Sequence, residues 1–243
     1  MQLAVSSVIL ALRPAAMDAD GSSNSGNNVD APEGPRNTLW LPLVRRIREP
    51  FEGLWALPGG PLGAGCGLVG AARDTLTRTT GLDPRYLEQL YAFGGLDRTE
   101  GAKASPDVER VVSIVYWALV RAEEDAAAVD GENVAWFPAD ALPELAFDHR
   151  EIIDYALSRL RAKLVYSPIA HAFLPDEFTL AELREVYEAV HGKPFDPANF
   201  RRQILATGDI EPTGRKLAGT NHRPPLLYRY AAEIVATSPT PAP

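Results

Sequence analysis

The sequence predicts an α+β fold of two domains, and three observations support this prediction. Strand-like and helix-like segments alternate up to about residue 164. Two short amphipathic helices and two strand-like segments follow, and the stretch 193–229 is net basic. With 243 residues and 46% hydrophobic side chains, the chain can supply a core for each domain. We therefore expect one domain at residues 1–162, a second at 163–235 and a disordered tail at 236–243.

The composition excludes several classes of protein. A net charge of −8 argues against a generally basic protein that coats nucleic acid, although it allows a local basic patch. The single cysteine, Cys66, cannot form an internal disulfide and fits a reducing compartment. No apolar run is long enough to cross a bilayer. These features favour a cytoplasmic protein that does not associate with a membrane.

The first domain opens with an apolar segment, residues 1–13, that we interpret as a buried strand. Its first basic residue, Arg13, follows the apolar run, whereas a signal peptide begins with positive charge. Residues 18–37 are rich in Gly, Ser, Asn and Asp, so we expect a disordered loop there. Further strands are expected at 38–47, 87–95, 110–120 and 132–137. Pro42 suggests that the first of these lies at an edge or carries a bulge.

Two helices are expected in the first domain. Leu68, Ala72 and Leu76 recur four residues apart, which predicts a helix over 67–80 with one apolar face. Gly81 is well placed to cap its C-terminus. A second helix is expected over 148–164.

A glycine frame surrounds the first of these helices. Leu57-Pro58-Gly59-Gly60 precedes it, and Gly81-Leu82 ends it. The spacing is that of the Nudix box, a loop–helix–loop that normally holds metal and hydrolyses nucleoside diphosphate derivatives. The glycines and the apolar positions are kept, but other residues stand at the glutamate positions of the pattern: Cys66, Thr75, Arg78 and Thr79.

The chemistry of that box depends on carboxylates, because they hold a divalent metal that neutralises the phosphates and activates water. Here the helix offers Asp74 alone, between the cations Arg73 and Arg78. We therefore expect no metal, no cofactor and no catalytic residues at this site. A substitute set of acids outside the box stays open as an alternative, although its spacing does not single it out: Glu88, Asp97, Glu100, Asp107 and Glu109. Cys66 is most simply a small buried residue.

The C-terminal region has the pattern of a winged helix-turn-helix. Thr179 and Glu182 form a capping box that begins one helix. Asp196-Pro197 begins a second helix, which ends near Gly208. Candidate strands at 210–212 and 226–230 then flank a polar, basic tip.

The second helix and the tip carry the side chains that a DNA-binding surface needs. Arginine, asparagine and glutamine make paired hydrogen bonds to base edges, and lysine and arginine contact phosphates. A solvated charged face on a small packing domain is the simpler alternative. We predict DNA contacts from Thr179, Lys193, Asn199, Arg201, Arg202, Gln203, Arg215, Lys216, His222 and Arg223.

A Nudix-like domain joined to this segment resembles the NrtR family, the Nudix-related transcriptional regulators of NAD metabolism. The resemblance covers nearly the whole chain. It is carried by Arg48-Glu49-Pro50-Phe51, residues 55–60, Tyr166-Ser167-Pro168, residues 178–180, 186–189 and 199–202, Pro212-Thr213-Gly214, and Leu227-Tyr228-Arg229.

The resemblance implies an α/β/α sandwich with a mixed sheet, followed by a winged helix. It also implies a homodimeric repressor of NAD biosynthesis genes that binds a palindromic operator in double-stranded DNA. ADP-ribose, or a related NAD-derived nucleotide, would bind the Nudix-like domain and release the DNA. By position, the candidates for this effector pocket are Arg46, Arg48, Phe51, Trp55, Gly59 and Gly60.

Two other functions stay open at this point. The first is a divergent Nudix hydrolase that acts on ADP-ribose, which the lost glutamates argue against. The second is a winged-helix module that binds protein and never contacts DNA.

Overall fold

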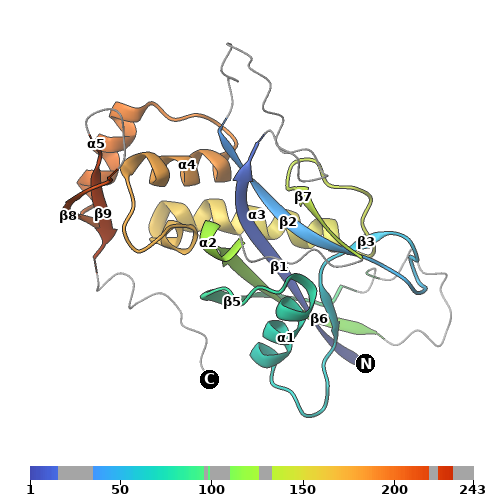
Figure 1. Ribbon diagram of the computed structural model, residues 1–243. Helices are drawn as coiled ribbons and strands as arrows, with labels where there is room; N and C mark the ends of the chain where they lie inside the picture. The colour runs from blue at the N-terminus through green and yellow to red at the C-terminus, as the bar shows by residue number, and fades with distance from the viewer. Residues whose placement is uncertain (16–34, 96–97, 99–109, 126–132, 219–223, 232–243) are drawn as a thin grey trace. The chain divides into compact units, whose positions relative to one another are not determined.

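The computed structural model describes residues 1–15, 35–95, 98, 110–125, 133–218 and 224–231 (Figure 1). The chain forms two compact units, residues 1–11 with 40–158 and residues 12–39 with 159–239. Most of the expected loop at 18–37 and the whole expected tail at 236–243 lie outside the described residues. The division falls inside a helix, after Ser158, so the domain boundary expected at 162/163 stays a prediction.

The core of the first unit is a mixed, seven-stranded sheet. Its strands are β1 (Gln2–Pro14), β2 (Asn37–Arg45), β3 (Trp55–Ala56), β4 (Gly59–Pro61), β5 (Tyr86–Phe93), β6 (Val111–Val120) and β7 (Val134–Pro138). The order is β3-β2-β1-β6-β5, with β4 paired to β1 and β7 paired to β2. Only the β1–β6 pairing among the described registers is parallel, and the others are antiparallel. The mixed sheet is thus confirmed.

The expected N-terminal strand is confirmed as β1, at the centre of the sheet. Val8, Ile9 and Leu10 are fully buried, so both faces of the strand are covered. This double burial explains why the segment reads as a continuous apolar run instead of an alternating one.

The interpretation of Pro42 as an edge residue is wrong. Pro42 lies in the middle of β2, opposite Trp136 of β7, in a strand that has neighbours on both sides. The β2–β7 register passes through Pro42 without a shift. Arg45 donates its N–H to the carbonyl oxygen of Asn133, in the same register as the β2–β7 ladder. Backbone N–H groups alternate in direction along a strand, so the nitrogen of Pro42, three residues earlier, points away from β7. The β2–β7 ladder therefore loses no hydrogen bond at Pro42.

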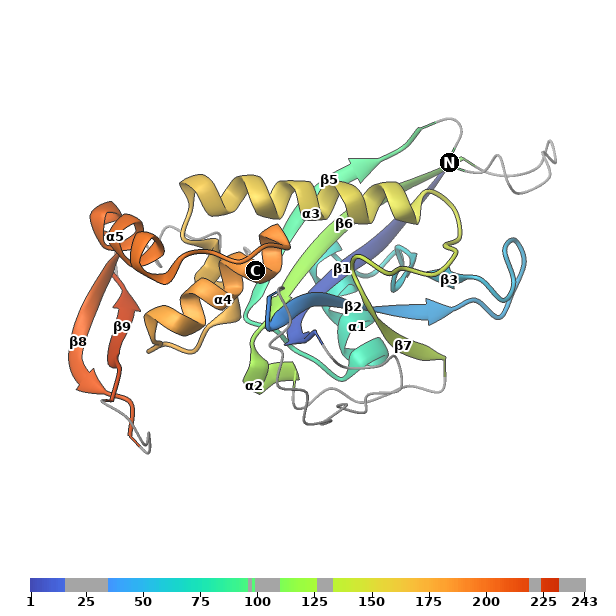
Figure 2. The same cartoon turned by 90° about the horizontal axis from the view of Figure 1, so that it is seen from above.

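Helices α1 (Leu68–Thr80) and α3 (His149–Tyr166) confirm the two expected helices, and α2 (Ala122–Asp125) is a short addition. Alpha1 and the first part of α3 lie on opposite faces of the sheet (Figure 2). Ala72 and Leu76 are buried, and Gly81 ends α1 with φ 72°, a left-handed conformation that glycine adopts without strain.

The second unit contains the winged helix-turn-helix. Its elements are the 3-10 helix η2 (Ile169–Phe173), α4 (Leu180–His191), α5 (Pro197–Thr207), β8 (Ile210–Lys216) and β9 (Leu226–Tyr230). Strands β8 and β9 form an antiparallel hairpin, and β8 is longer than the expected strand at 210–212. The core packs the buried side chains of Phe178, Leu183, Val186, Phe200 and Tyr228. No helix in the described part of the chain has the length and apolarity needed to cross a membrane.

Candidate functional site

The first unit contains a cavity of about 350 Å³ at the edge where β4 meets β1. Gly59 and Gly60 form part of its wall, so the glycine frame lies at this cavity. The two glycines differ in the space around them. A Cβ on Gly59 would come within 2.8 Å of Val5 O and Ser6 Oγ, whereas one on Gly60 would meet nothing within 4 Å. The lining residues are Gln2, Ala4, Ser6, Arg46, Ala56, Leu57, Gly59, Gly60, Pro61, Arg98, Val111, Ser113, Phe147 and His149.

Arg46 is fixed in the cavity wall by backbone carbonyls and by one aromatic ring. Its Nε donates to Pro50 O at 2.8 Å, and its Nη2 donates to Arg48 O at 3.3 Å. Its Cζ lies 4.7 Å from the centroid of the Phe147 ring. Burial lowers the pKa of Arg46, and the charge of Glu49 opposes that shift. The guanidinium of this half-buried residue is therefore held in place at the cavity wall.

Arg98 supplies a second guanidinium to the same cavity. Its Nη2 donates to Asp148 Oδ1 at 2.9 Å, and its Nη1 donates to Phe93 O. Its Nε also lies 2.6 Å from Asp148 Oδ2, a distance typical of an ion pair, although the N–H points poorly for a hydrogen bond. No Asp or Glu is among the described lining residues. The cavity therefore favours an anionic ligand.

His149, the first residue of α3, is buried at the cavity wall. Its Nδ1 accepts the backbone N–H of Leu57 at 3.0 Å. Burial lowers the pKa of His149 to about 4; nearby Asp148 opposes this shift, and Arg98 and Arg46 add to it. The imidazole is therefore neutral at pH 7.

The helix that would carry metal-binding carboxylates lacks them. At the glutamate positions, Thr75 is buried, Arg78 is exposed, and Cys66 and Thr79 are half-buried. Arg73 donates to Asp83 at 2.6 Å, and Asp74 is exposed. Among the described residues, no group of three His, Cys, Asp or Glu side chains could hold a metal ion.

The cavity brings together half of the expected effector residues. Arg46, Gly59 and Gly60 line it, whereas Arg48 and Trp55 do not. Arg48 is exposed and contributes only its carbonyl oxygen. Trp55 packs against Phe137 with ring centroids 4.9 Å apart.

Phe51, the remaining candidate, also lies outside the lining, but it packs against Phe147, which is a lining residue. Its ring meets that of Phe147 edge to face at 4.8 Å. Sequence reasoning did not single out Arg98, Phe147 or His149. The sequence offered one local indication of a role for these residues, namely that His149 lies at the start of an expected helix.

The second unit presents exposed polar side chains on α5. Asp196 caps this helix by accepting the Asn199 N–H at 2.8 Å. Asn199 Oδ1 in turn accepts from Arg202 Nη2 at 2.6 Å, so these two predicted DNA-contact residues are held together. Arg201 and Gln203 are also exposed on α5.

The other predicted DNA-contact residues differ in their surroundings. Lys193 is exposed, with its Nζ 5.7 Å from the Phe195 ring centroid. Lys216 is exposed near the end of β8, and Arg215 forms an ion pair with Glu177. His222 and Arg223 lie outside the described residues.

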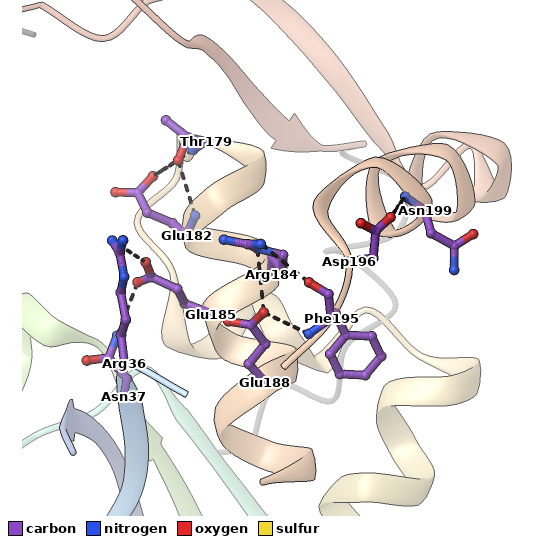
Figure 3. Close-up of polar contacts among 10 residues, drawn as sticks. All are labelled: Arg36, Asn37, Thr179, Glu182, Arg184, Glu185, Glu188, Phe195, Asp196 and Asn199. Carbon is purple, nitrogen blue, oxygen red and sulfur yellow. Dashed lines mark hydrogen bonds and ion pairs between the residues drawn. The ribbon is translucent and has the colours of Figure 1, made fainter. Parts of the chain in front are cut away.

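Thr179 differs from the rest because it is buried and its hydroxyl is already used. The hydroxyl accepts the Glu182 N–H at 3.2 Å and donates to Glu182 Oε2 at 2.9 Å (Figure 3). The backbone N–H of Thr179 donates to the same carboxylate oxygen at 2.6 Å, which completes the expected capping box. Its evident role is to begin α4.

A buried carboxylate links α4 to the start of α5. Glu188, 6% exposed, accepts the Phe195 N–H at 2.9 Å, and Arg184 Nε lies 3.6 Å from the same oxygen (Figure 3). Gly192 ends α4 with φ 67°. These contacts fix the turn from which α5 departs, and this role was not predicted from the sequence.

Comparison with known proteins agrees with both units. The model of the NrtR DNA-binding winged helix domain matches residues 170–230, and that of the NUDIX domain matches residues 33–156. The chain is 32% identical over 201 residues to the ADPR responsive transcriptional repressor NtrR of Acinetobacter baylyi, which covers 80% of this chain and 77% of the relative.

Solved structures give the same result. Shewanella oneidensis NrtR is similar with a TM-score of 0.71 and 30% identity, over 97% of each chain. Shewanella oneidensis NrtR complexed with a 27mer DNA is similar with a TM-score of 0.69 and 28% identity, over 96% of this chain and 95% of that one. This chain therefore belongs to the NrtR family, with a Nudix domain followed by an NrtR-type DNA-binding winged helix domain.

Proposed function

We propose that this protein is a transcriptional repressor of NAD biosynthesis genes whose Nudix domain senses ADP-ribose and releases DNA on binding it. The proposal rests on a cavity of about 350 Å³ at the glycine frame, beside a helix that has no carboxylate at the glutamate positions of the Nudix box. Such a cavity can bind a diphosphate compound without destroying it. The Acinetobacter baylyi relative, named as an ADPR responsive repressor, supports the same effector.

The cationic side chains of the cavity suit the diphosphate of ADP-ribose. Arg46 and Arg98 are each anchored by carbonyl or carboxylate oxygens, so they lose little conformational entropy when they bind an anion. The Cβ-free surface of Gly60 lets a ligand approach the backbone closely.

The winged helix supplies the DNA-binding surface. Arg202, Asn199 and Gln203 on α5 are of the types that read base edges in the major groove, and the Shewanella oneidensis relative has been solved with DNA. Lys193, Arg215 and Lys216 suit phosphates. A homodimer of winged helices would read a palindromic operator, with half-sites spaced by the dimer geometry.

Release of DNA requires that ADP-ribose bind the DNA-incompetent state of the protein more tightly than the DNA-bound state. The test is fluorescence anisotropy of a labelled duplex from the protein's own NAD-synthesis promoter, in fixed moderate salt because phosphate contacts make affinity salt-dependent. We expect specific binding that ADP-ribose weakens. Binding that is unchanged at saturating ADP-ribose would reject this effector while keeping the DNA role.

The alternative function, a divergent hydrolase, has support from the Nudix domain itself. We propose that the chain is not an enzyme, because Cys66, Thr75, Arg78 and Thr79 cannot provide the several oxygens that Mg²⁺ requires. Incubation of purified protein with ADP-ribose and Mg²⁺ should leave the nucleotide intact. Release of AMP and ribose 5-phosphate in proportion to protein would instead establish hydrolysis.

A further inference from the structure

We propose that His149 is an effector-binding residue whose Nε2–H donates a hydrogen bond to a phosphate oxygen of the nucleotide held by Arg46 and Arg98. The inference rests on the proposed sensing of ADP-ribose, which it deepens by naming a neutral, directional donor inside the cavity. Three observations on the described residues of the first unit carry it: the tautomer of His149, the Nε2–H that has no acceptor among those residues, and the charges around the ring.

The tautomer follows from the bond to Leu57. Because the Leu57 N–H is a donor, the Nδ1 of His149 must be the unprotonated nitrogen that accepts it, at 3.0 Å. A neutral imidazole carries one proton, so Nε2 carries it. The backbone just before Gly59 thereby sets both the tautomer and the ring orientation of His149.

The protonated nitrogen has no hydrogen-bond partner among the described residues, and the residue lines the cavity. His149 is only 7% exposed. Nε2 is not among the fully buried unpaired atoms of the described residues, so it reaches the open cavity, where an oxygen of a bound ligand can accept its hydrogen bond. The free protein therefore presents an oriented donor where the ligand would lie.

The charges around His149 keep it neutral and favour a negative partner. Burial dominates its lowered pKa of about 4, and Arg98 and Arg46 act in the same direction, so both guanidiniums are close enough to influence the ring. An anion that the two arginines attract would thus lie within reach of Nε2. Within the described part of the chain, the carboxylate that acts on the pKa of His149 is Asp148, and it is engaged with Arg98.

Two substitutions separate the two roles of His149, which are the Nε2–H bond to the ligand (the donor) and the Nδ1 bond to the Leu57 N–H (the anchor). In His149→Asn, the amide oxygen occupies the place of Nδ1 and can accept the Leu57 N–H, but nothing reaches the place of Nε2. In His149→Gln, the amide nitrogen occupies the place of Nε2 and can donate to the ligand, but the acceptor for Leu57 is lost. Calorimetric titration of the full-length variants with ADP-ribose and with inorganic pyrophosphate measures each role.

We expect His149→Asn to lose about tenfold or more in affinity for ADP-ribose, since a hydrogen bond to a charged oxygen is lost, while its unfolding temperature stays close to wild type. We expect His149→Gln to keep affinity within about threefold and to unfold at a lower temperature. Equal affinity of wild type and His149→Asn would overturn the proposal. So would His149→Gln losing as much affinity as His149→Asn, because the anchor alone would then matter.

Nitrogen NMR of the histidine side chains gives a second readout that also holds if a variant fails to fold. The chain has four histidines, so the His149 signals can be assigned by elimination after substitution of His171, His191 and His222. We expect the Nε2–H tautomer at pH 7 and a change of the Nε2–H signal on adding either probe. An Nδ1–H tautomer, or an Nε2–H signal that neither probe shifts, would refute the assignment.

The two proposals fail in different ways. If pyrophosphate shifts the Nε2–H signal but ADP-ribose does not bind, the donor stands and the proposed effector fails. If ADP-ribose binds equally to wild type and His149→Asn and still releases DNA, the sensing function stands and the role of His149 fails. If neither probe binds the wild-type protein, both the donor and the effector are rejected, and the DNA role is judged by anisotropy alone.

Discussion

The rings of Phe51 and Phe147 meet edge to face with centroids 4.8 Å apart, and both residues hold a left-handed backbone, at φ 67° and φ 56°. A bulky side chain rarely adopts positive φ, so each backbone is strained and must be held by its surroundings. The contact between the rings is one such restraint. It also places the Phe147 ring beside the Arg46 guanidinium, 4.7 Å away.

Replacing Phe147 should weaken both the fold and the cavity. Phe147→Ala removes the ring that lies against Arg46, and we expect the free energy of unfolding to fall by about 2 kcal/mol. Affinity for ADP-ribose should fall about fivefold, because the guanidinium loses its support. Phe137→Ala is the matched control, since Phe137 meets Trp55 edge to face and is outside the cavity lining. Denaturation and calorimetry should show destabilisation in both variants but weaker ligand binding only in Phe147→Ala.

The neighbouring glycines should respond differently to the same substitution. Gly59→Ala places a Cβ 2.8 Å from the backbone oxygen of Val5, so β4 must move away from β1. We expect a loss of about 1–3 kcal/mol in the free energy of unfolding. Gly60→Ala meets open space and should change this free energy by less than about 0.5 kcal/mol. Equal destabilisation of the two variants in urea denaturation would show that β4 is not packed as described.

Stability should decrease in acid because of His149. The pKa of its imidazole is lowered from about 6.5 to about 4 in the folded protein, so the unfolded chain binds the proton more tightly. The neutral side chain contributes its full stabilisation above pH 6.5, and this contribution is lost as the pH falls from about 6.5 to about 4. Protonation costs the folded state up to about 3 kcal/mol over this window.

Other groups titrate in the same range, so the comparison with His149→Asn isolates this effect. The difference in unfolding free energy between wild type and the variant should change between pH 7 and pH 4 and stay constant from pH 7 to pH 8. A pH-independent difference would mean that His149 is not buried in its neutral form.

Much of this architecture follows from local signals in the sequence. Strand β1, the Gly81 end of α1, and the Thr179 and Asp196 caps each depend on residues close in sequence, and the structure confirms them. The cavity, in contrast, is built from residues that are far apart in sequence. Arg98 and His149 come from segments remote from the glycine frame, and only tertiary folding brings them to Gly59 and Leu57.

The wrong edge position for Pro42 and the failure to predict Phe147 in the cavity wall both concern backbone geometry that the residue type does not reveal. An edge position was inferred from the missing N–H of proline, but Pro42 lies within the sheet, and the β2–β7 ladder continues through it because its nitrogen points away from β7. The positive φ of Phe147 has no sequence signature, because a turn that needs this conformation normally uses glycine or asparagine.

The arginine of α5 should control DNA affinity. Arg202→Ala removes a guanidinium held beside Asn199, and we expect operator affinity to fall about 10- to 100-fold in anisotropy titrations. Arg73→Ala is the control, because it removes the same charge from α1 in the other unit. Operator affinity that Arg202→Ala leaves unchanged would favour a protein-binding role for the winged helix.

The buried carboxylate of α4 should act on DNA binding through position alone. Glu188→Ala leaves the Phe195 N–H and Arg184 without their acceptor, so we expect a loss of about 2–3 kcal/mol in unfolding free energy and weaker operator binding. Glu188→Gln keeps one oxygen for Phe195 and should lose less. Exposed Glu151 serves as the control for charge removal. If Glu188→Ala binds the operator as wild type does, this carboxylate does not orient α5.

Coupling between the effector site and the DNA-binding surface must act in both directions. If ADP-ribose weakens operator binding by some factor, operator DNA must weaken ADP-ribose binding by the same factor. We would measure the Kd of ADP-ribose by calorimetry with the free protein and with the protein saturated by operator duplex. We predict a higher Kd in the complex, by the factor seen in anisotropy. An identical Kd in the two samples would contradict it.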